Sequence, residues 1–383
     1  MATKKQPQKR KKRTQKKQEK TKLKTNSPCP SRSPTQPTTK SNGLDTPEYP
    51  QSTQTKKLSI NNVPKNLDKY DKDFEHSKQI HTEHCKEHQK RWMRSIKNRR
   101  FKSTDIKDFE ALLGRKNLHA DFVPASDLKA RNKFGHFIID EMLRLYDLWL
   151  ENPDLDFQWI TFVSDHFMFN ERDGVAEIYA CKKATQDVLR NYTTYNAFGI
   201  VEIQPIINFP EGQKGKMFAV HTHVFCWGPK KQTAQLKRHS KRFKSSITRL
   251  PIHSQKVRHL EGSFGRLGRY MIKPPFEGKE VNFKRLVQGK ACLKPARRVE
   301  EFHHLRRLEV DAKTPIEAIA FGVRDGVAVR QRIVDKLRSW QASRTGEVVN
   351  LRGRVDQLFE DFLRDNKKLK NYKPLVVKYR KGQ

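Results

Sequence analysis

The sequence predicts an α+β domain, in which helices pack on one face of a central antiparallel sheet, flanked by a disordered basic N-terminal arm. Residues 157–164, 198–203 and 217–227 are rich in β-branched and aromatic side chains, which is typical of strands. Residues 126–152 carry apolar side chains at helical spacing. Residues 1–60 contain 16 Lys/Arg and 3 acidic residues with very few large apolar side chains, so this arm cannot offset the entropy cost of folding.

The charge of the chain indicates a polyanionic partner. The formal net charge is +38, and removing the +13 of the arm leaves +25 on the remaining residues. Nucleic acid is therefore expected to bind the folded part as well as the arm. No stretch approaches the ~18 consecutive apolar residues of a membrane span, and no apolar segment follows the basic N-terminus. We therefore expect no membrane partner. The five scattered cysteines fit neither a disulfide framework nor an ordinary zinc finger, so we expect the reducing environment of the cytoplasm.

We divide the chain into four parts. Residues 1–60 form the arm, whose basic runs either attach to phosphates or serve as a nuclear-localisation signal. Residues 61–118 form a helical segment to which the sequence assigns no role. Residues 119–345 carry the folded domain with its C-terminal helices, and residues 346–383 form a basic tail that we expect to be frayed towards its end.

A helix is predicted near residues 70–100, where His81, His84 and His88 fall on one helical face. Imidazoles grouped in this way can bind zinc. A solvated helix rich in Lys, Glu and His is the commoner meaning of such a pattern, and we favour it because no second pair of ligands lies nearby in the sequence.

The elements of the domain follow in order. The helix at residues 126–152 has Ser126 as its candidate N-cap and is expected to lie on the sheet. The strands at 198–203 and 217–227 are joined by a segment with Pro and Gly turn signals, so we expect an antiparallel hairpin. Residues 314–317 (Thr-Pro-Ile-Glu) have the pattern of a capping box, which predicts the start of a helix, and a further helical face follows.

The most informative segment is the third predicted strand, which contains His221 and His223. Side chains alternate between the faces of a strand, so both imidazoles project to the same side and can hold one cation. Glu202 lies in the preceding strand, where an unpaired carboxylate would be costly. If the hairpin closes near Gly212, Glu202 falls opposite His221 and becomes a third candidate ligand. Two alternatives remain: a structural His pair, and a Glu202 that pairs with an arginine.

Tyr270 and Lys273 stand three residues apart before Pro274, so they share a face if this segment is helical. A phenol is a poor nucleophile at its ordinary pKa of about 10, so its attack on a phosphate needs a nearby cation and a polarised electrophile. Lys273 and a metal at the histidines can supply these effects. Taken alone, the Tyr-x-x-Lys pattern is uninformative in a lysine-rich chain.

Taken together, the motifs resemble those of the HUH endonuclease superfamily, particularly the single-tyrosine rolling-circle replication initiators (Rep type). The pattern of that family is a strand motif, then a His-hydrophobic-His motif, then a Tyr-x-x-Lys helix. Residues 157–164, 220–224 and 267–273 are similar to these three motifs in the same order. Thr222 departs from the larger apolar residue that is usual between the histidines.

The resemblance implies a metal site and a nucleophile. His221, His223 and Glu202 would hold Mg²⁺ or Mn²⁺. Tyr270, assisted by Lys273, would cleave single-stranded DNA at a plasmid or phage replication origin. The products would be a 5′-phosphotyrosine link and a free 3′-hydroxyl for priming.

A basic segment lies beside these motifs. Residues 230–269 contain twelve Lys/Arg and one acidic residue, so we expect them to form a wall that tracks the DNA backbone, although a merely solvated basic helix is the alternative. The chain has no Walker A sequence, so unwinding would fall to a host helicase. The residues that we select as DNA contacts are Lys237, Arg238, Lys241, Arg242, Lys244, Arg266 and Arg269.

Three rival functions use parts of the same pattern. An HUH transposase or mobilisation relaxase would act with the same residues, but a single candidate tyrosine favours the replication initiator. A basic nucleic-acid-binding protein without catalysis would have structural histidines, and metal-dependent oligonucleotide cleavage separates it from the enzymes. A cupin-like oxygenase usually adds a carboxylate shortly after His-x-His, and residues 224–231 contain none.

Overall fold

The computed structural model describes the chain from residue 71 onwards, with gaps. The described residues are 71–98, 103–114, 119–120, 122–209, 216–238, 243–248, 250–274, 278–288, 293–295, 301–344, 348–349, 351–366 and 369–382. The predicted arm at residues 1–60 lies outside them.

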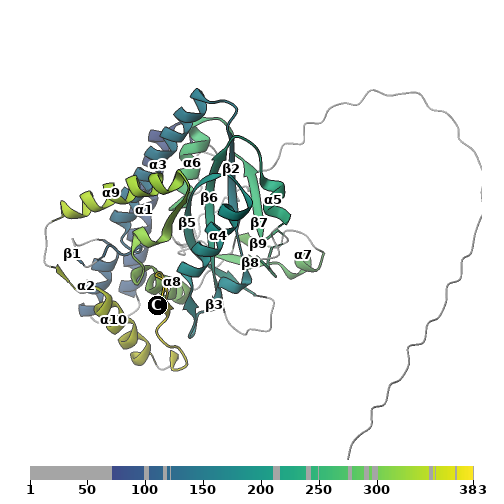
Figure 1. The fold of residues 1–383 in the computed structure, drawn as a ribbon. Helices are drawn as coiled ribbons and strands as arrows, with labels where there is room; N and C mark the ends of the chain where they lie inside the picture. The colour runs from purple at the N-terminus through teal and green to yellow at the C-terminus, as the bar shows by residue number, and fades with distance from the viewer. Residues whose placement is uncertain are drawn as a thin grey trace, which may run out of the picture. The chain divides into compact units, whose positions relative to one another are not determined.

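Helices and strands are interspersed along the described chain (Figure 1). The helices are α1 (Phe74–Asn98), α2 (Ser103–Leu112), α3 (Leu128–Glu151), η1 (Asp165–Phe167), α4 (Ile178–Tyr192), α5 (Thr233–Arg238), α6 (Glu261–Met271), α7 (Phe283–Val287), α8 (Glu301–Ala312), η3 (Ile316–Ile319), α9 (Gly326–Ala342) and α10 (Leu351–Asp365). The strands are β1 (His119–Ala120), β2 (Asp156–Phe162), β3 (Met168–Asn170), β4 (Val175–Ala176), β5 (Asn196–Ile207), β6 (Met217–Gly228), β7 (Ile252–Lys256), β8 (Lys279–Val281), β9 (Leu293–Pro295), β10 (Ala320–Val323), β11 (Val348–Val349) and β12 (Val376–Val377).

The main sheet has the strand order β7-β2-β6-β5-β8-β9, with β3 paired to β6 and β10 paired to β5. Its strands pair antiparallel except for the short parallel contact between β5 and β8. The predicted hairpin is confirmed, because β5 and β6 pair from Asn196 opposite Trp227 to Ile206 opposite Met217. The mainly antiparallel sheet that the sequence predicted is therefore present.

Helices cover both faces of this sheet, not one face as predicted. Thr222 of β6 faces α4, where its Oγ1 lies 3.0 Å from Thr185 Oγ1. On the opposite face, the ring of Phe225 contacts that of Phe264 in α6, and α6 in turn packs on α3. The prediction was wrong because α4 was not recognised, although its buried residues recur at helical spacing.

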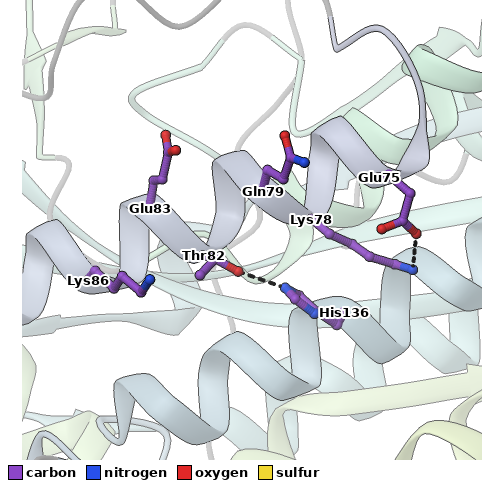
Figure 2. A pocket seen from close by; sticks show the side chains of 7 residues that line it. All are labelled: Glu75, Lys78, Gln79, Thr82, Glu83, Lys86 and His136. Atoms are coloured by element: carbon purple, nitrogen blue, oxygen red, sulfur yellow. Dashed lines mark hydrogen bonds and ion pairs between the residues drawn. The ribbon is translucent and has the colours of Figure 1, made fainter.

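The helix predicted near residues 70–100 is α1, but it is not a solvated helix. It packs against α3 and α6, and its His81 and His88 are only 0% and 6% exposed. Figure 2 shows the polar margin of the contact with α3, where Thr82 Oγ1 lies 2.9 Å from His136 Nε2. Polar composition suggested a solvated helix, but the neighbouring helices bury one of its faces.

The start of α3 is set by Asp127 and not by Ser126, the predicted N-cap. Asp127 Oδ1 accepts hydrogen bonds of 2.9 Å from the backbone N–H groups of Lys129 and Ala130. Ser126 Oγ instead donates to the carbonyl of Leu112 at 2.8 Å. Both serine and aspartate can cap a helix. Here the Ser126 hydroxyl is taken by the Leu112 carbonyl, and Asp127 faces the first backbone N–H groups of α3.

The capping box predicted at residues 314–317 does not start an α-helix. Thr314 Oγ1 donates to the Val310 carbonyl at 2.6 Å and so closes the end of α8. Only the 3-10 turn η3 follows before the chain enters the sheet as β10. Phe321 and Val323 of β10 are almost completely buried against β5, and this packing overrides the local capping signal.

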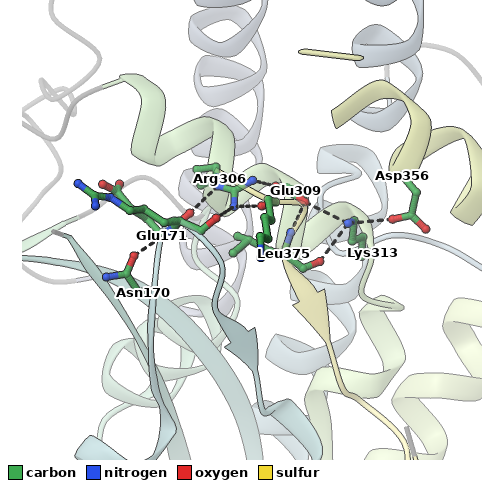
Figure 3. A network of polar contacts seen from close by, with 9 residues as sticks. Asn170, Glu171, Arg306, Glu309, Lys313, Asp356 and Leu375 are labelled. Carbon is green, nitrogen blue, oxygen red and sulfur yellow. Dashed lines mark hydrogen bonds and ion pairs between the residues drawn. The ribbon is translucent and has the colours of Figure 1, made fainter. Parts of the chain in front are cut away.

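The C-terminal segment is packed against the domain, not frayed as predicted. Tyr379 is 4% exposed, and β12 pairs with β4. A buried charge network holds the segment (Figure 3): Glu309 Oε1 accepts from the backbone N–H of Leu375 at 2.7 Å and from Lys313 Nζ at 3.0 Å. Arg306 donates to the other oxygen of the same carboxylate. The basic composition of the segment was misleading because its backbone finds buried partners.

Replacing Glu309 with alanine is expected to lower the free energy of unfolding by about 3–5 kcal/mol, because the buried cations Arg306 and Lys313 would lose their shared partner. Chemical denaturation measures this change. A matched control is Glu317→Ala, whose partner Arg338 is exposed and whose loss should cost at most about 1 kcal/mol. Equal costs for the two variants would show that the buried network contributes no more than a surface pair.

Candidate functional site

The hairpin of β5 and β6 brings three candidate ligands together. Glu202 of β5 lies directly opposite His221 of β6, as predicted, and His223 follows two residues later on the same face. The side chains of His221, His223 and Glu202 are 7%, 6% and 10% exposed. This face also carries α6, so the site lies beneath a helix and not on a helix-free face as predicted.

The ligand atoms converge on one point. Glu202 Oε2 lies 2.9 Å from His223 Nε2 and 3.4 Å from His221 Nε2. One donor atom from each of these residues lies within 4.8 Å of the other two, which is close enough for one metal ion. Two imidazole nitrogens and a carboxylate oxygen form a donor set that suits several divalent metals.

The outer ring nitrogens of the two histidines are held by the strands themselves. His223 Nδ1 lies 3.0 Å from Thr161 Oγ1 on β2, and His221 Nδ1 lies 3.3 Å from the Ala219 carbonyl. The Ala219 carbonyl can accept from Nδ1 of His221, whose Nε2 faces Glu202. Partners of this kind orient the histidines of metal sites. The arrangement therefore fits a metal ion.

Two residues of β2 complete the site and were missed from the sequence. Trp159 stacks on the His223 ring, with centroids 5.3 Å apart and planes inclined by 19°. Thr161 pairs with His223 across the strands. The signal that could have found them is the period of two in β2, which puts Trp159 and Thr161 on one face.

The surroundings of the site keep the Glu202 carboxyl ionised and the His223 imidazole neutral near pH 7. Burial raises the pKa of the Glu202 carboxyl, but the Lys273 ammonium and hydrogen bonds with His221 and His223 outweigh burial and hold this pKa well below its usual range. Burial lowers the pKa of His223 to about 4, although its hydrogen bond with Glu202 opposes this shift. An ionised carboxylate beside a neutral imidazole is the state that binds a metal.

The depressed pKa of His223 predicts how the metal-free protein responds to acid. The His223 ring signal in NMR spectra should stay constant from pH 7.5 to about pH 5 and titrate near pH 4. Because the folded pKa lies below the unfolded value of about 6.5, protonation favours the unfolded state. Stability from this group is complete above about pH 6.5 and falls by up to about 1.4 kcal/mol per unit between that pH and about pH 4. A midpoint near pH 6.5 would contradict the buried, neutral state.

Tyr270 lies in the last turn of α6 and reaches the same place. Its ring centroid is 5.2 Å from that of His223 and 5.9 Å from that of Trp159, edge-on in both cases. Lys273 Nζ lies 4.2 Å from the centroid of the Tyr270 ring and 3.4 Å from Glu202 Oε1. All five residues predicted as ligands or catalytic groups are therefore brought together, and the cation beside Glu202 is a lysine, not an arginine.

Thr222, which departs from the pattern expected between the histidines, faces away from the site. It is completely buried, and its hydroxyl lies 3.0 Å from Thr185 Oγ1 on α4. Thr185 Oγ1 in turn donates to the Cys181 carbonyl at 3.0 Å. A polar side chain is tolerated at this position because α4 supplies its hydrogen-bond partner.

The residues selected as DNA contacts differ in their exposure and in their partners within the fold. Arg238 and Lys244 are exposed, and Arg266 is half-buried on α6, four residues before Tyr270. Arg269 instead makes hydrogen bonds of 2.7 and 3.0 Å to the buried carboxylate of Asp71, so its charge is used within the fold. The remaining choices lie outside the described residues: Lys241, Arg242 and the side chain of Lys237.

Comparisons with known proteins add no identification. No protein-family model, curated protein or solved structure matches this chain. Among the described residues, no helix has the length and apolar character needed to cross a membrane.

Proposed function

We propose that this protein nicks single-stranded DNA by tyrosine transesterification and so starts rolling-circle replication. The observation that carries the proposal is the packing of the Tyr270 ring against the His223 ring, 5.2 Å between centroids, beside a buried cluster able to hold a metal. A tyrosine next to such a cluster has its phenol beside the place where a phosphate would meet the metal.

In the proposed reaction the phenol oxygen of Tyr270 forms a bond to phosphorus, and the bond from phosphorus to the 3′ oxygen of the preceding nucleotide breaks. The proton that the phenol loses balances the proton that the leaving oxygen gains, so the products are a 5′-phosphotyrosine and a free 3′-hydroxyl. Lys273, with Nζ 4.2 Å from the centroid of the Tyr270 ring, is placed to offset negative charge that develops on the phenol or the phosphate.

The resident metal in this proposal is Mg²⁺ or Mn²⁺, held by Glu202, His221 and His223. When bound, it would polarise a phosphate oxygen and offset the charge of the transition state. Thr161 keeps the His223 ring oriented towards that position, and Trp159 stacks on the same ring and excludes water from one side of it.

The substrate is single-stranded DNA at a replication origin, and strand separation falls to a helicase partner. Exposed Arg238 and Lys244, and half-buried Arg266, supply cations for the DNA backbone. We leave Arg269 out of this set because Asp71 already neutralises it.

One experiment tests the whole proposal. The full-length protein is incubated with single-stranded oligonucleotides covering candidate origins and with Mn²⁺, and denaturing gels are examined for DNA joined to protein. A metal-dependent, denaturation-resistant adduct is expected. Metal-dependent cleavage without an adduct would indicate a nuclease that activates water at the same site. Binding without any cleavage would favour a nucleic-acid-binding protein whose histidines are structural.

Deleting residues 1–60 is expected to weaken DNA affinity about tenfold or more at low salt without stopping adduct formation, because the arm adds cations that release counterions from DNA. Fluorescence anisotropy at several salt concentrations measures the change, and the slope of log affinity against log salt should become shallower. An unchanged slope would show that the arm does not bind DNA.

A further inference from the structure

The helix that carries Tyr270 fits unusually closely against its neighbours. A Cβ atom at Gly262 of α6 would lie 1.7 Å from the backbone oxygen of Asp71, and one at Gly265 would lie 2.4 Å from Ser77 Oγ. Gly268 meets Met142 of α3 in the same way, at 2.9 Å. Gly265 and Gly268, five and two residues before Tyr270, lie on the side of α6 that faces away from it. The back of α6 is therefore in direct contact with α1 and α3.

A buried ion pair fixes the last turn of α6. Arg269, the residue before Tyr270, donates to both oxygens of Asp71, from Nε at 3.0 Å and from Nη2 at 2.7 Å. The Asp71 side chain is completely buried, and Ser77 Oγ donates to it at 2.6 Å. A two-point contact with a planar guanidinium restricts rotation as well as distance.

A second buried arginine holds the chain on the other side of Tyr270. Arg131 of α3 is 4% exposed and donates from Nη1 to the Lys273 carbonyl at 3.2 Å. Its Nε and Nη2 donate to the Ala125 carbonyl at 3.0 and 2.7 Å, which fixes the guanidinium itself. Tyr270 thus lies between two anchored residues, Arg269 before it and Lys273 after it.

Asp71 and Arg131 reach Tyr270 through its neighbours in the chain: Asp71 binds the Arg269 guanidinium, and Arg131 donates to the Lys273 carbonyl. What they control is where the Tyr270 ring lies relative to His223. Misplacing a reacting group by about 1 Å can cost on the order of 100-fold in rate, so such anchors matter for a nucleophile.

We propose that Asp71 and Arg131 are positioning residues for the nucleophile, which hold Arg269 and the Lys273 backbone so that Tyr270 stays against His223. This inference rests on the proposed function. It also assigns a role to the segment at residues 61–118 that the sequence left without one, because Asp71 precedes α1 and Ser77 of α1 donates to its carboxylate.

The test compares Asp71→Asn with a matched control pair elsewhere in the fold. Glu141 of α3 is also completely buried and accepts two hydrogen bonds from one guanidinium, that of Arg332, at 3.0 and 2.7 Å. Glu141→Gln therefore removes the same kind of charge from a pair that joins α3 to α9 and not to α6. Thermal unfolding of both variants shows how much each substitution costs the fold.

The kinetic measurement is the single-turnover rate of adduct formation with saturating oligonucleotide and Mn²⁺. Asp71→Asn should slow this rate about 10- to 100-fold with an unchanged oligonucleotide Kd, while Glu141→Gln should leave the rate near that of the unaltered protein. Equal slowing in both variants would indicate general destabilisation and overturn the inference. Weaker DNA binding in Arg269→Met but not in Asp71→Asn would make Arg269 a DNA contact instead.

A second measurement needs no reaction. In protein labelled with 3-fluorotyrosine, the Tyr270 resonance is assigned by its loss in Tyr270→Phe. We expect this resonance to shift or broaden in Asp71→Asn and to stay unchanged in Glu141→Gln. If the unaltered protein forms no adduct but the resonance responds in this way, the proposed function fails and the anchor stands. An unaffected resonance in Asp71→Asn removes the anchor whatever the activity.

Discussion

Replacing Tyr270 with phenylalanine is expected to abolish the covalent protein–DNA adduct, a loss of at least about 1000-fold in its rate of formation, since it removes the oxygen that forms the bond to phosphorus. The substitution removes one oxygen and keeps the ring, so the edge-on contacts with His223 and Trp159 remain. Denaturing gels after incubation with single-stranded DNA and Mn²⁺ measure the adduct. Any loss then reflects the missing phenol oxygen and not a change in packing.

Tyr146→Phe provides the control for this experiment. Tyr146 also packs against α6, with its ring centroid 5.4 Å from that of Phe264, and its other ring neighbours are Phe74 and Trp149. Adduct formation should survive in this variant. An adduct that persists in Tyr270→Phe would require another tyrosine, such as Tyr192 or Tyr195. Tyr195 is the poorer candidate, because its hydroxyl donates to Asp156 Oδ2 and burial raises its pKa above the usual range.

Replacing His221 or His223 with alanine is expected to abolish metal-dependent cleavage and to weaken Mn²⁺ binding by at least about 100-fold, because each removes one of three ligands. Oligonucleotide affinity should change little, since phosphate attraction comes from dispersed cations. Calorimetric titration with Mn²⁺ and anisotropy with labelled DNA measure the two properties separately.

The exposed histidine of η1 is the matched control, and His166→Ala should leave both metal binding and cleavage intact. A parallel loss of DNA binding and cleavage in the His221 and His223 variants would instead assign these residues a structural role. Retained cleavage would remove the metal from the reaction.

The site could be predicted from the sequence because strand geometry is local and regular. Alternation alone put His221 and His223 on one face, and the length of the hairpin put Glu202 opposite His221, which the pairing of β5 with β6 reproduces. The contact of Tyr270 with His223 did not follow from spacing, because it depends on how α6 lies over the sheet. The expectation that Tyr270 acts together with the histidines came instead from the order of the motifs along the chain, which resembles that of a known family.

The errors came from elements whose environment is set by distant residues. The capping box at residues 314–317 is a valid local signal, but Phe321 and Val323 gain more by completing the sheet beside β5. Residues 70–100 were expected to be solvated and the end of the chain to be frayed, yet His81 is completely buried and the backbone of Leu375 donates to the buried Glu309 carboxylate. Composition reports average exposure and does not identify the buried partner that offsets a particular charge.

The pairing of β5 with β6 also limits how this protein can tolerate insertions and deletions. Because side chains alternate with a period of two, one extra residue inside β6 before His221 would carry both imidazoles to the opposite face, beside Thr185 of α4. Two extra residues would restore the face but displace the histidines from Glu202 by about 7 Å along the strand. Length changes within these strands are therefore compatible with the site only when β5 and β6 lengthen together, on the side of the ligands nearer the turn.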